Sequence, residues 1–166
     1  MHKRPRLLVA SILLVAMVVH IAAHSWVGFS YRTPRVVTLA IAVIGLRWGS
    51  VAGAFLGALS GLFLVLLTGE APFVGTAALA AAGWVAGEIP TRFVVESYRT
   101  IGLAILAAAL TELVLVCLMR GMMPPGGLNA LIWMAGWAMI VGPSLYRLVV
   151  RLSTPPPVPR LPSEPE

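Results

Sequence analysis

Apolar residues fill six long stretches of the chain, and charged residues mark the boundaries between them. The stretches are residues 7–31, 36–46, 48–69, 71–87, 100–119 and 121–146, of which the fifth contains one acid, Glu112. A helix needs about 20 apolar residues, with a range of about 17 to 25, to cross a hydrocarbon core of about 30 Å. Five of the six stretches reach that length, so the pattern predicts transmembrane helices.

The stretch 36–46 is the exception, because its 11 residues cover only about 16 Å as a helix. Joined to the next stretch it would form a helix of 34 residues, about 51 Å long, which is too long even with a strong tilt. We therefore expect two helices joined tightly at residues 47–50, the first of them short or extended outward through Tyr31 to Pro34. The predicted fold is an all-α integral membrane protein, a compact bundle of six transmembrane helices within residues 1–152.

The composition agrees with a chain dissolved in lipid. Apolar residues make up 59% and charged residues 11%, against about 25% charged residues in an average globular chain. The single cysteine, Cys117, excludes a disulfide scaffold. The pI of about 10.8 indicates no nucleic-acid partner, because the chain has no room for a basic soluble domain.

The basic residues instead predict the orientation of the bundle. Six crossings place nine of the twelve Lys and Arg residues on one side: Lys3, Arg4, Arg6, Arg47, Arg92, Arg99, Arg147, Arg151 and Arg160. Arg32, Arg35 and Arg120 fall on the other side. Cytoplasmic loops carry the excess of Lys and Arg, so we expect a multi-pass protein of the cell membrane with both termini in the cytoplasm. The basic start followed by an apolar stretch also fits a secretory signal peptide, although the uncharged stretch is long for one.

Residues 153–166 form a separate tail, with six prolines in fourteen residues. Proline removes backbone donors and favours extended polyproline II structure. We expect a disordered cytoplasmic tail, with a recognition peptide as the alternative.

The clearest pattern inside the membrane is a series of glycines four residues apart, which makes a flat stripe on a helix. It consists of Gly49, Gly53, Gly57 and Gly61, and a shorter series in the next stretch includes Gly83 and Gly87. Small residues let transmembrane helices approach closely. The stripe therefore predicts either packing against another helix of the same chain or an interface with a second subunit, including a homodimer.

Glu112 is the only acid well inside an apolar stretch, and His20 and His24 lie at similar depth in the first one. An ionised acid in hydrocarbon is costly unless it is paired or faces protein. We hypothesise that Glu112 forms a hydrogen bond with one of these histidines, as a structural tie or as a proton or ligand site. These three residues do not match a metal-binding motif, and no metal or other cofactor is expected.

Two prolines predict interruptions. Pro90 lies beside the alternating charges Glu88, Arg92, Glu96 and Arg99, so we expect it to end the fourth helix before a short interfacial one. Pro143 should kink the last helix.

The sequence offers no catalytic constellation. It contains no Asp for an aspartyl pair, no Gly-x-Ser-x-Gly elbow and no Walker motif. We expect a protein that is not an enzyme.

The central region, residues 36–119, resembles the rod shape-determining protein MreD family. The resemblance lies in GSVAGAFLGALSGL at residues 49–62, the loop TGEAPFVG at 68–75 and AGWVAG at 82–87. Members commonly carry an acid shortly after the glycine helix, where this chain has Phe63, Leu64 and Val65.

The resemblance implies a bacterial inner-membrane scaffold of the cell-elongation machinery that makes peptidoglycan. Its expected partner is MreC, a protein with one membrane span, and through MreC the cytoskeletal protein MreB, the glycosyltransferase RodA and a class B penicillin-binding protein. The family is also thought to share its fold with the S components of energy-coupling factor transporters. The alternative is therefore an S component that binds a vitamin or a metal for uptake. The Ala-x-x-x-Ala motif typical of S components is absent, because Leu14 follows four residues after Ala10.

Overall fold

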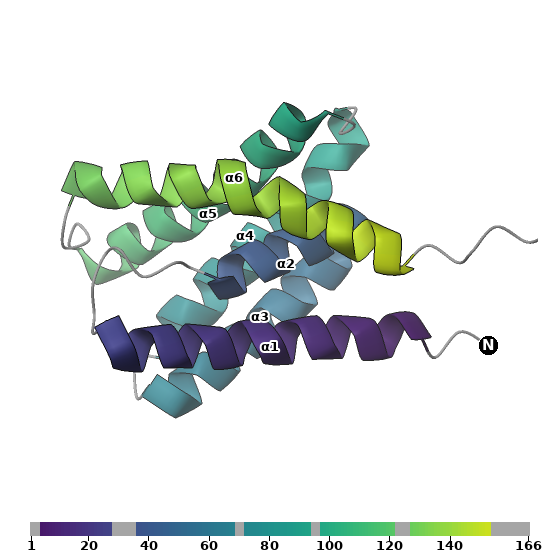
Figure 1. Cartoon of the computed structure of the whole chain (residues 1–166). Coiled ribbons are helices and arrows are strands. Elements are labelled where there is room, and N and C mark those ends of the chain that lie inside the picture. Colours follow the sequence, from purple (N-terminus) through teal and green to yellow (C-terminus); the bar gives the residue numbers. More distant parts are fainter. Residues whose placement is uncertain (1–3, 28–35, 69–71, 94–96, 122–126, 154–166) are drawn as a thin grey trace, which may run out of the picture.

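The computed structural model describes residues 4–27, 36–68, 72–93, 97–121 and 127–153, which form six helices and no strand (Figure 1). The helices are α1 (Arg4–Val27), α2 (Val36–Trp48), α3 (Ser50–Thr68), α4 (Pro72–Arg92), α5 (Tyr98–Arg120) and α6 (Gly127–Ser153). The prediction of an all-helical chain is confirmed for these residues. The expected Pro-rich tail lies outside them, apart from Ser153, which is the last residue of α6.

Four of the described helices, α3 to α6, are long and apolar enough to cross a membrane. Their outward faces carry large apolar side chains, of which Val51 is 82%, Phe73 81% and Leu118 73% exposed. Water-soluble proteins rarely expose contiguous apolar surfaces of this kind. The length, composition and surface of these helices indicate a membrane protein.

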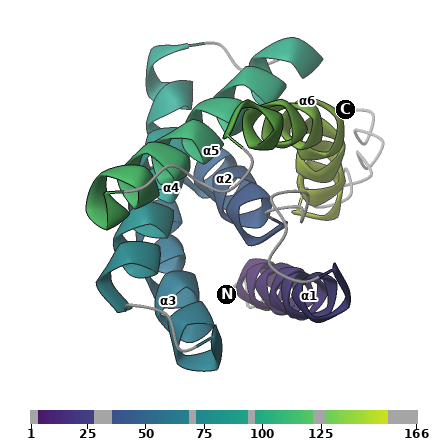
Figure 2. The same cartoon turned by 90° about the vertical axis from the view of Figure 1, so that its left-hand side faces the viewer.

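The short helix α2 forms the centre of the bundle (Figure 2). It packs against all five other helices, and every residue from Val37 to Leu46 is buried. A helix that is apolar on every face has no side suited to water and is stable only when neighbours surround it. At 13 residues, α2 is about 20 Å long, shorter than the hydrocarbon core.

The predicted break between the second and third helices is confirmed at Gly49. Trp48 ends α2 and Ser50 begins α3, while Gly49 between them has a φ of 93°. Glycine adopts this left-handed conformation without a steric penalty. The Gly49 amide donates to the carbonyl of Gly45 over 2.8 Å, so the chain turns directly from one helix into the next.

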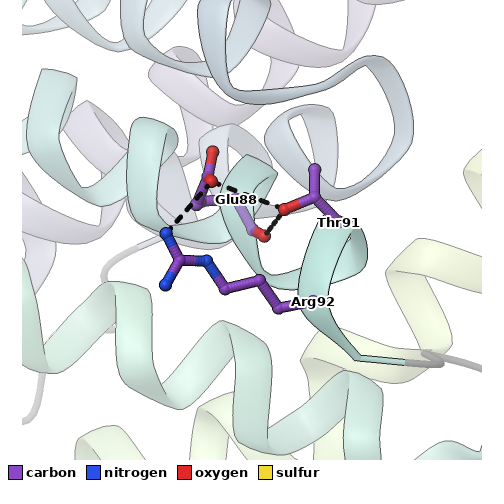
Figure 3. A network of polar contacts seen from close by, with 3 residues as sticks. All are labelled: Glu88, Thr91 and Arg92. Carbon is purple, nitrogen blue, oxygen red and sulfur yellow. Dashed lines mark hydrogen bonds and ion pairs between the residues drawn. The ribbon is translucent and has the colours of Figure 1, made fainter.

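The prediction that Pro90 ends the fourth helix is wrong, because α4 continues to Arg92. Polar contacts hold this last turn together (Figure 3). Arg92 forms an ion pair with Glu88 over 3.5 Å, and the Thr91 hydroxyl donates to the Glu88 carbonyl over 2.6 Å. A proline removes one backbone donor, and one missing bond near a helix end is tolerated when side chains stabilise the turn. The expected interfacial helix is therefore absent at residues 88–93, and residues 94–96 lie outside the described chain.

Pro143 lies inside α6, and the helix changes direction in its second half (Figure 1). The described structure thus agrees with the predicted kink.

Candidate functional site

The glycines of α3 lie against the backbone of α4, and we call this contact the glycine seam: Gly53, Gly57 and Gly61 of α3 against Thr76, Leu79 and Gly83 of α4. A Cβ atom built on Gly57 would lie 2.7 Å from the Leu79 carbonyl carbon, and one on Gly61 would lie 2.6 Å from Thr76 Cα. Carbon atoms in contact normally stay about 3.5–4.0 Å apart. The two backbones therefore approach so closely that no side chain fits between them.

A third helix joins the seam through Gly45 of α2, a residue that the sequence analysis did not single out. A Cβ atom built on Gly45 would lie 2.5 Å from the Gly83 carbonyl oxygen, and one on Gly53 would lie 2.8 Å from Gly45 Cα. Three backbones, those of α2, α3 and α4, thus converge on one point. This convergence lets the short α2 pack deep against the α3–α4 pair.

Gly49 and Gly87 make a different contact at the end of the seam. Gly49 lies in the turn before α3, and a Cβ atom built on it would meet nothing within 4 Å. A Cβ atom on Gly87 would instead collide with the backbone of Gly49 and Ser50. The α4 backbone is therefore pressed against the turn itself.

The seam occupies the small-residue face of α3 within a single chain. Gly53, Gly57 and Gly61 pack against α4 of the same chain. This is the first of the two alternatives that the glycine stripe predicted. The opposite side of α3 is the exposed one, with Val51, Phe55, Leu59, Leu62 and Leu66.

Glu112 is buried in α5, with an exposed fraction of 9%. The hydroxyl of Thr38, itself 3% exposed near the start of α2, donates to Glu112 Oε2 over 2.5 Å. The first turn of a helix carries partial positive charge, so the carboxyl group lies where α2 stabilises negative charge. Thr38 was not singled out from the sequence, because a lone threonine carries no signal of its partner.

The proposed contact between Glu112 and a histidine stays a hypothesis. His20 is half-buried in α1, and α1 packs mainly on α2 rather than on α5. The side chain of His24 lies outside the described residues. Thr38 of α2 is the contact of Glu112 that the geometry establishes, and it ties α2 to α5.

A second polar group lies where α5 begins and α6 ends, and we call it the basic corner: Tyr98, Ser144, Arg147 and Arg151. The Tyr98 hydroxyl lies 2.7 Å from Ser144 Oγ and donates to the Ile140 carbonyl over 3.1 Å. The Arg147 guanidinium lies over the Tyr98 ring, 4.9 Å from its centroid. A cation over an aromatic face is attracted by the ring, so Tyr98 fixes both the second half of α6 and the position of Arg147.

Neither polar group resembles a metal centre. Among the residues that the structure describes, no three His, Cys, Asp or Glu side chains gather in a group that could hold a metal ion. The comparisons with known proteins add no relative: no protein-family model, no curated protein and no solved structure matches this chain.

Proposed function

We propose that the chain crosses a bacterial inner membrane six times, with both termini in the cytoplasm. Helix α1 begins and helix α6 ends at the same end of the bundle (Figure 1); we call this the basic end. Chain order brings the end of α2 and the α4–α5 connection to that end as well, with Arg47, Arg92 and Arg99. The excess of arginine supports a cytoplasmic position for this end.

Reporter fusions test this topology. Alkaline phosphatase is active only outside the cytoplasm, whereas green fluorescent protein exported by the general secretion route does not fluoresce. We expect phosphatase activity for fusions after Val27 and Arg120, and fluorescence for fusions after Trp48 and Ser153. A fluorescent fusion after Val27 would show that α1 does not cross, and phosphatase activity after Ser153 would reverse the orientation.

We further propose that the protein is a non-enzymatic scaffold of the cell-elongation machinery, as its likeness to the MreD family suggests. The supporting observation is the distribution of charge. Within the described helices, Glu112 is the only charged residue far from a helix end, and it is buried. The surfaces left for other molecules along the length of the bundle are apolar helix faces, which suit lipid and the transmembrane helices of partners.

Co-purification tests the scaffold function. A tagged chain, co-expressed with the MreC protein of the same bacterium and extracted in mild detergent, should retain that protein at a fixed ratio. A single-span membrane protein of unrelated function, expressed to the same level, serves as the control. Equal recovery of both proteins, or of neither, would contradict the proposal.

An S component for uptake of a vitamin or metal is the second candidate, and the Thr38–Glu112 pair favours it. Thr38 lies nine residues before Arg47 and Glu112 fourteen residues after Tyr98, so the pair lies about 14–21 Å from the basic end, near the middle of the membrane. Transporters often place substrate sites at that depth, beside the ends of short helices. Saturable binding of a radiolabelled vitamin to the isolated chain, lost in Glu112→Gln, would support uptake over the scaffold.

A further inference from the structure

The exposed face of α6 changes from apolar to cationic along its length. Ile140, Ser144, Arg147 and Arg151 follow one another at intervals of four, three and four residues, which places them on one side of the helix. All four are exposed, Ile140 by 69%. The apolar residue lies toward the middle of the bundle and the two arginines toward the basic end, about 17 Å away at most.

Farther from the basic end, the same exposed face of α6 continues as an apolar surface. Trp133 is 48% exposed, and a Cβ atom built on Gly136 would meet nothing within 4 Å. The missing side chain at Gly136 leaves a flat area between Trp133 and Ile140. The exposed face of α6 is therefore apolar from Trp133 to Ile140 and cationic from Arg147 to Arg151, toward the basic end.

The arginines of this face have no acidic partner in the described part of the chain. Helix α6 contains no acid at all, and the one acid of α5, Glu112, is buried far from this end. The described Glu88 pairs with Arg92 instead. Arg99 adds a third exposed cation next to Tyr98. Within the described residues, therefore, no carboxylate balances the positive charge at the basic corner.

Three side chains of the corner, those of Tyr98, Ser144 and Arg147, are also held in position. Tyr98 is fixed by its hydroxyl contacts with Ser144 and Ile140, and its ring in turn holds Arg147. A guanidinium group that is already oriented loses less side-chain freedom when it binds a phosphate. The corner therefore differs from the freely moving arginines of an ordinary membrane-facing loop.

We propose that the basic corner binds the phosphate group of an anionic phospholipid of the cytoplasmic leaflet. Arg147 and Arg151 contact the phosphate, and an acyl chain lies along Ile140 and Gly136. Charge complementarity favours this occupant, since an anionic lipid presents a phosphate directly beside its apolar acyl chains. The site is independent of the scaffold and uptake functions considered above, and its assignment to the cytoplasmic leaflet rests on the proposed topology.

Native mass spectrometry of the full chain, exchanged between phosphatidylglycerol and phosphatidylcholine in mixed micelles, tests the site. We expect the protein to retain phosphatidylglycerol preferentially, and Arg147→Gln and Arg151→Gln to weaken that retention about fivefold each, which corresponds to the usual contribution of one cation near an anionic membrane. Both arginines are exposed, so the variants should elute from gel filtration like the parent protein.

Two controls remove the same charge elsewhere. The first control is Arg92→Gln, because Arg92 lies at the basic end but already pairs with Glu88. The second is Arg120→Gln, because Arg120 lies at the opposite end of α5. Both should retain phosphatidylglycerol like the parent. Equal losses in Arg92→Gln and Arg147→Gln would mean diffuse attraction without a site and overturn the proposal. No preference for phosphatidylglycerol, or equal displacement of it by free glycerol phosphate, would overturn it as well.

Discussion

Replacing Gly57 with alanine is expected to destabilise the protein by about 3 kcal/mol, the upper end of the usual range for an added methyl group in a packed interior. The new Cβ atom would lie 2.7 Å from the Leu79 carbonyl carbon and 3.0 Å from Ala80 Cα. These are backbone atoms of α4, which cannot rotate away as a side chain can. The only relief is to move α3 and α4 apart, which loosens the contacts along the whole glycine seam.

Two further glycines provide matched controls for the same Gly→Ala change. At Gly136 the added methyl group would meet nothing within 4 Å, so the higher helix propensity of alanine should stabilise by up to about 1 kcal/mol. At Gly75 it would meet only Val65 Cγ2 at 3.4 Å, an ordinary contact, so the change should be close to neutral.

Helix content measured by circular dichroism, during titration of a mild-detergent solution with sodium dodecyl sulfate, would rank the three variants. Gly57→Ala should unfold at a clearly lower fraction of the denaturing detergent than the parent, and the other two should not. Identical midpoints for Gly57→Ala and Gly136→Ala would show that the seam does not limit stability.

The glycine seam also shows how far the sequence could predict the fold. The four-residue interval of the glycines on α3 is a local pattern, so it could be read directly as a flat helix face. Gly45 could not be found in this way, because it stands alone on α2 and meets Gly83, which lies 38 residues later in the chain. A single glycine becomes informative only when the crossing point of two helices is known.

The central position of α2 could not be predicted for a related reason. Its residues from Val36 to Leu46 are apolar or small on every side, so hydrophobic periodicity gives it no preferred face. The break at Gly49 was predictable because a fused helix would have been too long for the membrane. Which neighbours enclose α2 depends on long-range packing that leaves no periodic signal.

Some features of the polar contacts could likewise be predicted from the sequence, and others could not. Burial of Glu112 follows from the cost of a charge in hydrocarbon, whereas the identity of Thr38 as its donor depends on how α2 is rotated toward α5. The last turn of α4 was mispredicted because the rule for Pro90 ignored Thr91 and Arg92, whose side chains contact Glu88. Local sequence rules thus predicted the helices, whereas the residue contacts between helices could be identified only in the structure.

Thr38→Val is expected to destabilise the protein by about 1–3 kcal/mol, because it removes a hydroxyl donor from a buried acid and changes little in shape. The matched control is Thr111→Val, one residue before Glu112. The Thr111 hydroxyl donates to the Ala107 carbonyl of its own helix over 2.9 Å, so its loss breaks no contact between helices. For this control we expect the free energy of unfolding, measured in the same detergent titration, to fall by about 0.5 kcal/mol or less.

The double variant Thr38→Val/Glu112→Leu separates the hydrogen bond from simple packing. Glu112→Leu alone leaves the Thr38 hydroxyl, which is 3% exposed, without its acceptor, and Thr38→Val alone leaves the carboxyl group without that donor. With both polar groups gone, neither of these two penalties remains. The double variant should therefore be more stable than the sum of the two single losses predicts, by about 1 kcal/mol or more. Strictly additive losses would mean that Thr38 and Glu112 contribute independently, and the tie between α2 and α5 would then rest on their apolar neighbours.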